Sequence, residues 1–197
     1  MSSKLRFFPI LITVLLLASC ATPPPITEES TQWDSYQQQL AALERWSLRA
    51  QIAFISPEQR QKANLWWQQD QQQSHTRLTG PLGVEVFELR YQPGQVWLKD
   101  DKKNEYRGND AQALLQRLTG WQLPVEQLPR ILIGLPASDL YQLNDADRLA
   151  AQQIAQQWQI DYLNYANYSG RVLPRQMQLV RNEITIKINI VDWQIND

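Results

Sequence analysis

The sequence predicts a mainly β fold of the α+β class: a long antiparallel sheet that curls and carries two helices inserted between its strands. Apolar and polar residues alternate in several runs, short loops containing Gly and Pro join these runs, and two helical patterns interrupt them. Because such short loops can connect only strands that run in opposite directions, we expect an antiparallel sheet. One domain suffices for this length.

The chain opens with the pattern of a secretory signal peptide. Lys4 and Arg6 precede an apolar run from Phe7 to Leu17, which is too short to span a bilayer as a helix. The run ends in Leu-Ala-Ser-Cys at residues 17–20, which resembles the bacterial lipobox, where a peptidase cuts before a lipid-modified cysteine. We expect residues 1–19 to be a signal peptide and Cys20 to be the lipidation site. A general secretory peptide with an incidental cysteine is the alternative.

The residues after the lipobox predict a tether and then the folded domain. Ala21, rather than Asp, follows the cysteine, which in lipoproteins of this kind favours the periplasmic face of the outer membrane. Residues 20–30 contain three consecutive prolines and no apolar periodicity, so we expect a lipidated N-terminus and a flexible tether. The domain then spans 31–197 and begins with an amphipathic helix over residues 31–43, whose apolar positions are Trp33, Tyr36, Leu40 and Leu43.

Period-two alternation and helix signals predict the remaining elements. Asp110 is the expected N-cap of a helix over residues 111–118, and Pro124 is expected to open a second helix that runs through Ile133. Gly120 and Gly134 follow these helices and predict their ends. The expected strands cover residues 47–54, 62–68, 74–79, 84–91, 95–99, 157–165, 175–181 and 183–195.

Composition and motif content exclude several function classes. The chain has 19 Lys and Arg against 20 Asp and Glu, which lacks the basic excess of a nucleic-acid binder. One Cys and one His cannot build a disulfide framework, a structural zinc site or a Cys–His nucleophile pair. No nucleophile elbow or phosphate loop occurs, and His75 is expected to be an exposed strand residue. We therefore expect no enzymatic activity, cofactor or metal.

Two features favour an apolar ligand or a lipid contact. The chain has eight tryptophans, more apolar bulk than a Gln-rich domain ordinarily needs, although an ordinary core accounts for some of them. A curled sheet with a helical cover can enclose a ligand cavity.

Leu82 occupies the tip of the turn Gly80-Pro81-Leu82-Gly83, where residues are usually polar. An incidental exposed leucine is the alternative to a lipid contact.

An ordered set of motifs along nearly the whole chain resembles the outer-membrane lipoprotein receptor LolB family. Cys20 and the Trp-containing helix come first, and the chain closes with a strand that reaches Trp193. The long polar stretch 142–157 and the paired Trp66-Trp67 depart from the family pattern. Between the two ends lie the strand 49–56, Trp67-Gln68-Gln69, Leu78-Thr79-Gly80-Pro81-Leu82-Gly83, Leu118-Thr119-Gly120 and Ile133-Gly134-Leu135-Pro136.

This resemblance implies an incomplete antiparallel β-barrel with a helical lid that encloses an apolar cavity for the acyl chains of other lipoproteins. The soluble periplasmic carrier LolA, of the same fold, would deliver this cargo, and the protein would insert it into the outer membrane. Leu82, flanked by Pro81 and Gly83, would form the membrane-insertion loop. The expected partners are LolA, lipoprotein cargo and outer-membrane lipid, with the protein acting as a monomer and binding no nucleic acid.

Strand faces and helix faces select the residues of the expected acyl cavity. An ordinary filled core is the alternative for each of them, since a wrong register exchanges the two faces of a strand. The expected wall comprises Ile52, Phe54, Leu65, Trp67, Phe87 and Leu89, and the underside of the lid comprises Leu114, Leu118, Leu128 and Leu132.

Two other functions compete with the receptor. The protein could be a structural envelope lipoprotein, a scaffold subunit of an outer-membrane assembly machine, which predicts a filled core and a stable partner. A lipid-processing hydrolase is a weaker alternative, because the nucleophile constellation is missing.

Overall fold

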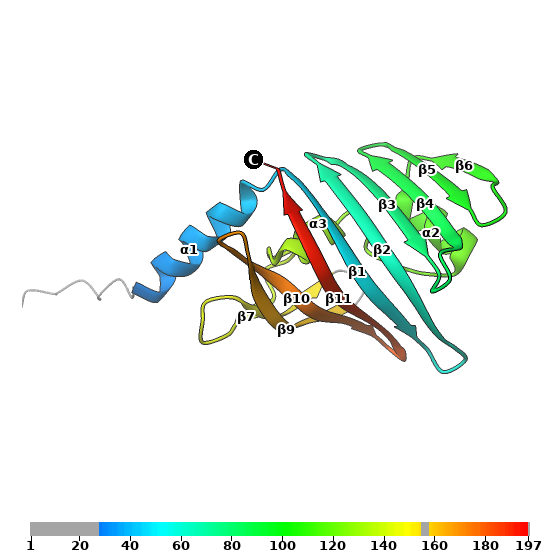
Figure 1. Ribbon diagram of the computed structural model, residues 1–197. Coiled ribbons are helices and arrows are strands. Elements are labelled where there is room, and N and C mark those ends of the chain that lie inside the picture. The colour runs from blue at the N-terminus through cyan, green and yellow to red at the C-terminus, as the bar shows by residue number, and fades with distance from the viewer. Residues whose placement is uncertain (1–27, 155–157, 197) are drawn as a thin grey trace, which may run out of the picture.

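An eleven-stranded antiparallel sheet forms the body of the molecule, and its strand order is β6-β5-β4-β3-β2-β1-β11-β10-β9-β8-β7. The computed structural model describes residues 28–154 and 158–196; Cys20, the expected signal peptide and most of the expected tether lie outside these residues. The sheet curls strongly, but its edge strands β6 and β7 do not pair (Figure 1). The fold is therefore an incomplete antiparallel barrel, which confirms the predicted class.

Three helices accompany the strands. Helix α1 precedes β1, and α2 and α3 lie between the edge strands β6 and β7; the sequence predicted a helical pair inserted between strands but neither of these two strands. The helices are α1 (Glu28–Ala41), α2 (Ala111–Thr119) and α3 (Leu128–Ile133). The strands are β1 (Arg45–Ile55), β2 (Arg60–Asp70), β3 (Gln73–Thr79), β4 (Glu85–Gln92), β5 (Gln95–Asp100), β6 (Glu105–Gly108), β7 (Tyr141–Leu143), β8 (Leu149–Ile154), β9 (Trp158–Tyr168), β10 (Arg171–Arg181) and β11 (Ile184–Ile195).

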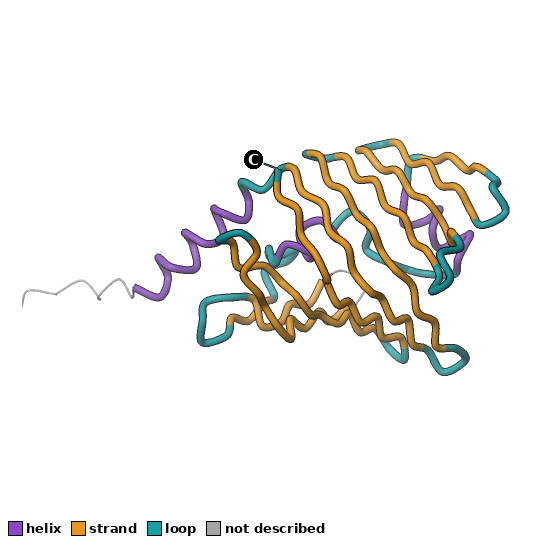
Figure 2. The backbone as a smooth tube through the Cα atoms, viewed as in Figure 1, coloured by secondary structure: helices purple, strands orange, loops and turns teal. Residues whose placement is uncertain are grey.

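The two inserted helices form a lid over the concave face of the sheet. They lie behind the strands in the view of Figures 1 and 2, and their apolar side chains join those of the sheet in one buried cluster. Helix α2 packs near β5 and β6, whereas α3 packs near β10. The two helices thus bridge the gap between the two sheet edges. They bury the apolar face that an open sheet would expose to water.

Helix α1 packs against the barrel through its apolar stripe. Trp33, Tyr36 and Leu40 are buried, as the spacing predicted, and the Tyr36 hydroxyl donates a 2.7 Å hydrogen bond to the carbonyl of Val172 in β10. The helix begins at Glu28, so residues 28–30, which the sequence assigned to the tether, are helical. Among the described residues, no helix has both the length and the apolar character needed to cross a membrane.

Three features of the secondary structure were predicted wrongly or missed. The second lid helix begins at Leu128 rather than Pro124, and residues 125–127 form a turn before it, because Pro129 has no N–H to donate to that turn. The polar stretch 142–157 contains two strands, β7 and β8, which the Gln-rich pattern concealed. Strand β6 was also missed, since four residues give little periodicity.

Candidate functional site

The concave face beneath the lid brings together all six residues of the predicted cavity wall. Strand register sets Leu65 against Ala50 and Leu78, and Leu78 in turn pairs with Phe87. Paired residues project to the same side of an antiparallel sheet, so β1, β2, β3 and β4 present a common apolar surface. Phe54, Leu65, Trp67, Phe87 and Leu89 are buried there, and Ile52 is half-buried.

The lid contributes its predicted leucines to the same cluster. Leu114 in α2 and Leu132 in α3 are buried, while Leu118 and Leu128 are half-buried against the core. The sequence-based selection missed Leu115 and Ile131, which are also buried. Both belong to helices whose apolar periodicity was recognised, so a wider stripe would have found them.

Trp121 fills the space between the lid and the sheet and was not predicted as a site residue. Its indole stacks on Phe54, with ring centroids 5.0 Å apart and planes inclined by 15°. It also forms an edge-to-face contact with Phe87, with ring centroids 6.2 Å apart. The lid therefore places an aromatic ring against the wall that the resemblance assigned to acyl chains.

Buried hydrogen bonds fix α3 to the sheet. The Tyr162 hydroxyl donates to the carbonyl of Ile131 at 2.9 Å, and the Gln152 amide donates to that hydroxyl at 2.6 Å. The Gln152 side-chain oxygen accepts from the backbone N–H of Ala137 at 2.7 Å. Burial raises the pKa of Tyr162 far above its usual range, so the phenol keeps the proton that it donates.

A glycine ends α3 beside Pro174 of β10. Gly134 has a φ of 83°, a left-handed conformation that side-chain-bearing residues rarely adopt. A Cβ atom at this position would lie 3.2 Å from Cγ of Pro174. The backbone conformation therefore favours glycine in the Ile-Gly-Leu-Pro motif, and the packing leaves little room for a side chain.

A cleft opens the interior at the end of the barrel where the β1–β2 and β5–β6 hairpins lie. Its volume is about 470 Å³. Val86 of β4, Gln59 of the first hairpin and Lys102 of the second contribute to it. Its apolar wall consists of Phe87, Leu98, Tyr106, Leu118 and Trp121. The cleft thus connects the lid residue Trp121 with the strand that follows the Leu82 loop.

The loop before β4 presents apolar side chains to solvent. Leu82 is 93% exposed, Val84 66% and Val86 38%. The turn is closed by hydrogen bonds from the Gly83 N–H to the Gly80 carbonyl and from the Gly80 N–H to the Val84 carbonyl. Gly83 takes a φ of 79°, so a side chain at this position would be strained. The predicted exposure of Leu82 is confirmed, and Pro81 beside it is exposed as well.

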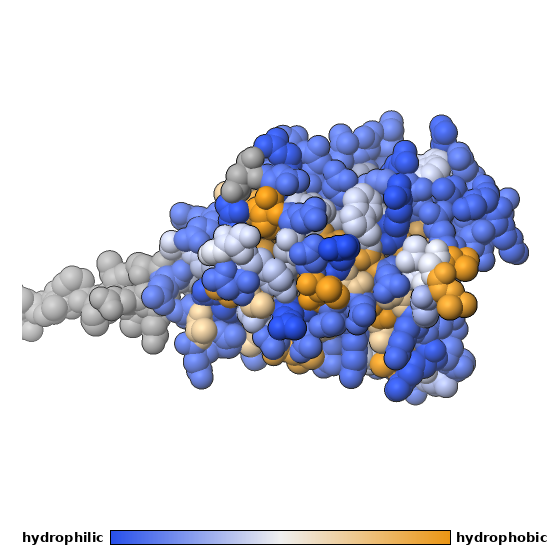
Figure 3. Space-filling view, in the orientation of Figure 1, coloured by the Kyte–Doolittle hydropathy of each residue, from blue (hydrophilic) through white to orange (hydrophobic). Residues whose placement is uncertain are grey.

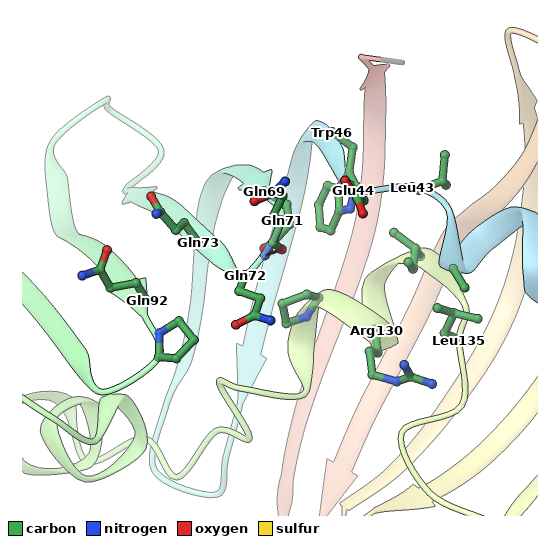
Figure 4. A pocket seen from close by; sticks show the side chains of 14 residues that line it. Leu43, Glu44, Trp46, Gln69, Gln71, Gln72, Gln73, Gln92, Arg130 and Leu135 are labelled. Atoms are coloured by element: carbon green, nitrogen blue, oxygen red, sulfur yellow. Dashed lines mark hydrogen bonds between the residues drawn. The ribbon is translucent and has the colours of Figure 1, made fainter.

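The opposite end of the barrel has a larger opening of about 830 Å³ (Figure 4). Trp46 and Leu43 lie on one side of it, and Arg130 and Leu135 of the α3 region on the other. Its rim carries the glutamines Gln69, Gln71, Gln72, Gln73 and Gln92. Amide groups prefer water to hydrocarbon, so this rim adds polar surface to the opening.

The outer face of β3, β4 and β5 carries a carboxylate surrounded by cations. Glu88 is buried and lies 2.6 Å from Nε2 of His75, 2.9 Å from Arg90 and 3.0 Å from Lys99. Burial alone would raise the pKa of Glu88, but hydrogen bonds from Lys99, His75 and Arg90 outweigh it and lower the pKa to about 2. The prediction of a freely exposed His75 was wrong, because this ion-pair cluster holds the ring half-buried.

The described residues offer little for metal chemistry. Nowhere among them do three or more His, Cys, Asp or Glu side chains gather where they could hold a metal ion. The site defined by the structure is thus an apolar face with a helical lid and a projecting apolar loop.

Solved structures of low sequence identity share this architecture. A LolA superfamily protein from Nitrosomonas europaea superposes with a TM-score of 0.58, covering 86% of this chain and 94% of that chain at 13% identity. A DUF1329 family protein from Desulfovibrio piger gives a TM-score of 0.57 at 7% identity, covering 85% of this chain and 93% of that chain. The protein therefore has the half-barrel fold of the LolA superfamily.

Sequence comparison identifies the family within this class. The model of the family described as "Outer membrane lipoprotein LolB" matches residues 44–193. The chain is 31% identical to the outer-membrane lipoprotein LolB of Tolumonas auensis, covering 97% of each chain, and 35% identical to that of Psychromonas ingrahamii, covering 95% of each. The chain belongs to the LolB family of outer-membrane lipoproteins, which assigns it a role in lipoprotein localisation.

Proposed function

We propose that this protein is a receptor that accepts lipoproteins from LolA by binding their acyl chains between the concave face and the lid, and then inserts them into the outer membrane. The observation that carries the proposal is a row of apolar side chains. It starts at the exposed Leu82, continues through Val84 and Val86, and reaches Leu118 and Trp121 in the cleft that leads beneath the lid.

Transfer from one apolar site to another explains why such a receptor needs no nucleotide. Each methylene exposed to water costs about 0.8 kcal/mol, so free acyl chains would cost tens of kcal/mol. If the receptor binds the acyl chains more tightly than the carrier does, transfer of the cargo to the receptor is favourable. Transfer from the receptor to the bilayer is also favourable, because the bilayer buries the chains completely.

Trp121 occupies part of the proposed acyl site in the closed state. Its contacts with Phe54 and Phe87 are apolar ring contacts, worth about 0.5–1.5 kcal/mol per pair beyond burial. A hydrocarbon chain can supply equivalent contacts to the same wall. In the proposed mechanism the incoming chain displaces Trp121, and the α2 side of the lid moves with it.

The proposal includes a location and an anchor. Lipid on Cys20 would hold the protein at the periplasmic face of the outer membrane, with residues 21–27 joining the anchor to the domain. The protein would act as a monomer, since a hand-off requires only one carrier and one receptor. A chain that begins at residue 20 and carries Cys20→Ala should still accept cargo from LolA.

The test separates acceptance from insertion. Leu82→Glu should leave acceptance from LolA unchanged and reduce insertion into liposomes at least tenfold, because a carboxylate resists entering hydrocarbon. The matched control is Leu140→Glu, since Leu140 is a second leucine that is 65% exposed but lies in the loop before β7. Equal insertion by the wild type and Leu82→Glu would remove the loop from the mechanism.

The packed interior is also compatible with the competing function, a structural scaffold. A scaffold subunit of an assembly machine would have the packed core seen beneath the lid and would need no opening. It predicts a stable partner in a pull-down from membranes and no transfer of lipoproteins from LolA. Cargo acceptance by the purified protein favours the receptor.

A further inference from the structure

A groove of about 620 Å³ crosses the outer face of the sheet beside the apolar loop. It extends over β2, β1, β11 and β10, with Pro81 at one side and Leu163 of β9 at the other. Leu163 is 59% exposed and lies where the register between β9 and β10 shifts. Apolar patches lie within a largely hydrophilic surface in Figure 3. The groove therefore offers apolar surface close to Leu82.

Two lysines flank an alanine on the floor of this groove. Ala53 pairs with Lys62 of β2 and with Lys187 of β11, so the three side chains project from the same face in one row. Adjacent strands are about 4.8 Å apart, which puts the two lysine backbones roughly 10 Å from each other. Because alanine carries only a methyl group, both flexible lysine stems can reach over it towards a single anion.

The charge of this lysine pair is not compensated within the described part of the chain. Neither Lys62 nor Lys187 forms an ion pair there, whereas Lys99 and Lys103 pair with Glu85. Cross-strand from Lys187 on its other side is Gln178, which donates a hydrogen bond to Asp161. The amide side chains of Gln51, Asn64 and Asn189, also in the groove, can donate further hydrogen bonds to an anion.

We infer that this groove binds an anionic phospholipid of the target membrane. The phosphate lies between Lys62 and Lys187, and the glycerol and first methylenes lie along Ala53 and Leu163. The inference rests on the proposed insertion role of Leu82, because that loop brings the Pro81 side of the groove to the bilayer surface. An acidic segment of a protein partner would also suit the lysines, but the position beside the insertion loop favours lipid.

The test uses the full chain in detergent micelles with ¹³C-labelled alanine methyl groups. The Ala53 methyl is the reporter, and dihexanoyl phosphatidylglycerol is the probe. We expect its resonance to shift and saturate with this lipid. Dihexanoyl phosphatidylcholine and inorganic phosphate should bind at least fivefold more weakly, since the first lacks net charge and the second lacks the apolar part. Equal affinity for phosphate would reduce the groove to a simple anion site and overturn the inference.

Two variants and a control assign the effect to the groove. Lys62→Gln/Lys187→Gln should weaken binding of phosphatidylglycerol at least fivefold, whereas Arg45→Gln/Arg107→Gln, with the same loss of charge at two exposed positions outside the groove, should bind like the wild type. Ala53→Leu retains both lysines and should also weaken binding, because the larger side chain fills the space above the alanine. Since this variant lacks the Ala53 methyl, binding is followed by the NMR signals of the lipid itself. Unchanged binding by either groove variant contradicts the inference.

The same variants distinguish this inference from the proposed function. Cargo acceptance from LolA should be unaffected by the lysine substitutions, and loss of acceptance would instead identify the groove as a protein-docking surface. Leu82→Glu should still bind the short-chain lipid at Ala53. Suppose that Leu82→Glu inserts cargo normally while the Ala53 resonance still shifts with lipid. The insertion role of Leu82 is then contradicted, whereas lipid binding by the groove is supported.

Discussion

The two halves of the lid are held to the sheet by different forces. In α3 the Ile131 carbonyl accepts a hydrogen bond from the Tyr162 hydroxyl, and just after the helix the Ala137 N–H donates one to the Gln152 side chain. Helix α2 packs through Leu114 and Leu115, and within the described residues none of its groups hydrogen-bonds to the sheet. Hydrogen bonds depend on direction, whereas apolar contacts can be exchanged for other apolar contacts. Helix α2 itself is therefore the part of the lid that an acyl chain can displace, whereas Gln122, after Trp121, accepts hydrogen bonds from Trp158 of β9 and Arg181 of β10.

The largest expected effect is on α3. Leu132→Ala should lower the free energy of unfolding by about 2–5 kcal/mol, because it leaves a cavity in a packed interior. Leu114→Ala in α2 should cost less, since this helix packs near the sheet edge and can relax. Urea unfolding followed by tryptophan fluorescence measures both. An equal or larger loss for Leu114→Ala would remove the distinction between the two halves.

Removing one hydroxyl should weaken the anchored half specifically. Tyr162→Phe leaves the Ile131 carbonyl and the Gln152 amide without their partner in a buried place, which costs about 1–3 kcal/mol. Tyr141→Phe is the matched control, because that hydroxyl accepts a longer, 3.4 Å hydrogen bond from Trp33 and its own ring is 37% exposed. Hydrogen exchange of residues 128–137 should quicken in the first variant alone. Unchanged exchange there would mean that packing, rather than hydrogen bonding, holds α3.

The sheet beneath α2 should respond to acid through Glu88. Because the folded-state pKa is lowered to about 2 from 4.5, the ionised carboxylate stabilises the protein above about pH 4.5, and this stabilisation is lost as the pH falls towards 2. The effect is smaller than those above, since water and salt partly screen the exposed cations. Glu88→Gln should lack this dependence. Parallel stability curves for both proteins between pH 6 and 2 would contradict the role of the cluster.

A loss of stability should accompany a gain of function at Trp121. Trp121→Ala removes the ring contacts with Phe54 and Phe87, worth about 1–3 kcal/mol beyond burial, and should speed uptake of a fluorescent fatty acid at least threefold. Trp97→Ala, which removes an indole from the outer face of β5, is the control and should leave uptake unchanged. Slower uptake by Trp121→Ala would show that the ring helps to bind the chain rather than occupying its place.

The smallest expected change in stability is at the loop. Leu82 touches little of the protein, so Leu82→Glu should alter the free energy of unfolding by less than about 0.5 kcal/mol. Thermal unfolding of the two proteins checks this. A clear loss would show that the loop packs on the domain and that its effect on insertion cannot be separated from folding.

Local rules predicted much of the fold and part of the site. Alternation in residues 184–190 and turn chemistry around Leu82 each depend on a few neighbouring residues, and both were interpreted correctly. Strand β8 was missed because Gln152 looks like a surface residue, whereas its amide is buried and satisfied by groups distant in sequence. Trp121 lies between two helices, where no periodicity indicates which way it points. Its role is visible only once Phe54 and Phe87 are brought beneath it.

The central claim, that acyl chains lie between the sheet and the α2 half of the lid, has one direct test. A lipoprotein with a photoreactive acyl chain is delivered by LolA to the full chain, and the cross-linked peptides are identified by mass spectrometry. The account predicts labels in residues 85–92 of β4 and in residues 118–121 of the lid. Labels confined to the outer face of the sheet, after cargo has been accepted, would contradict it.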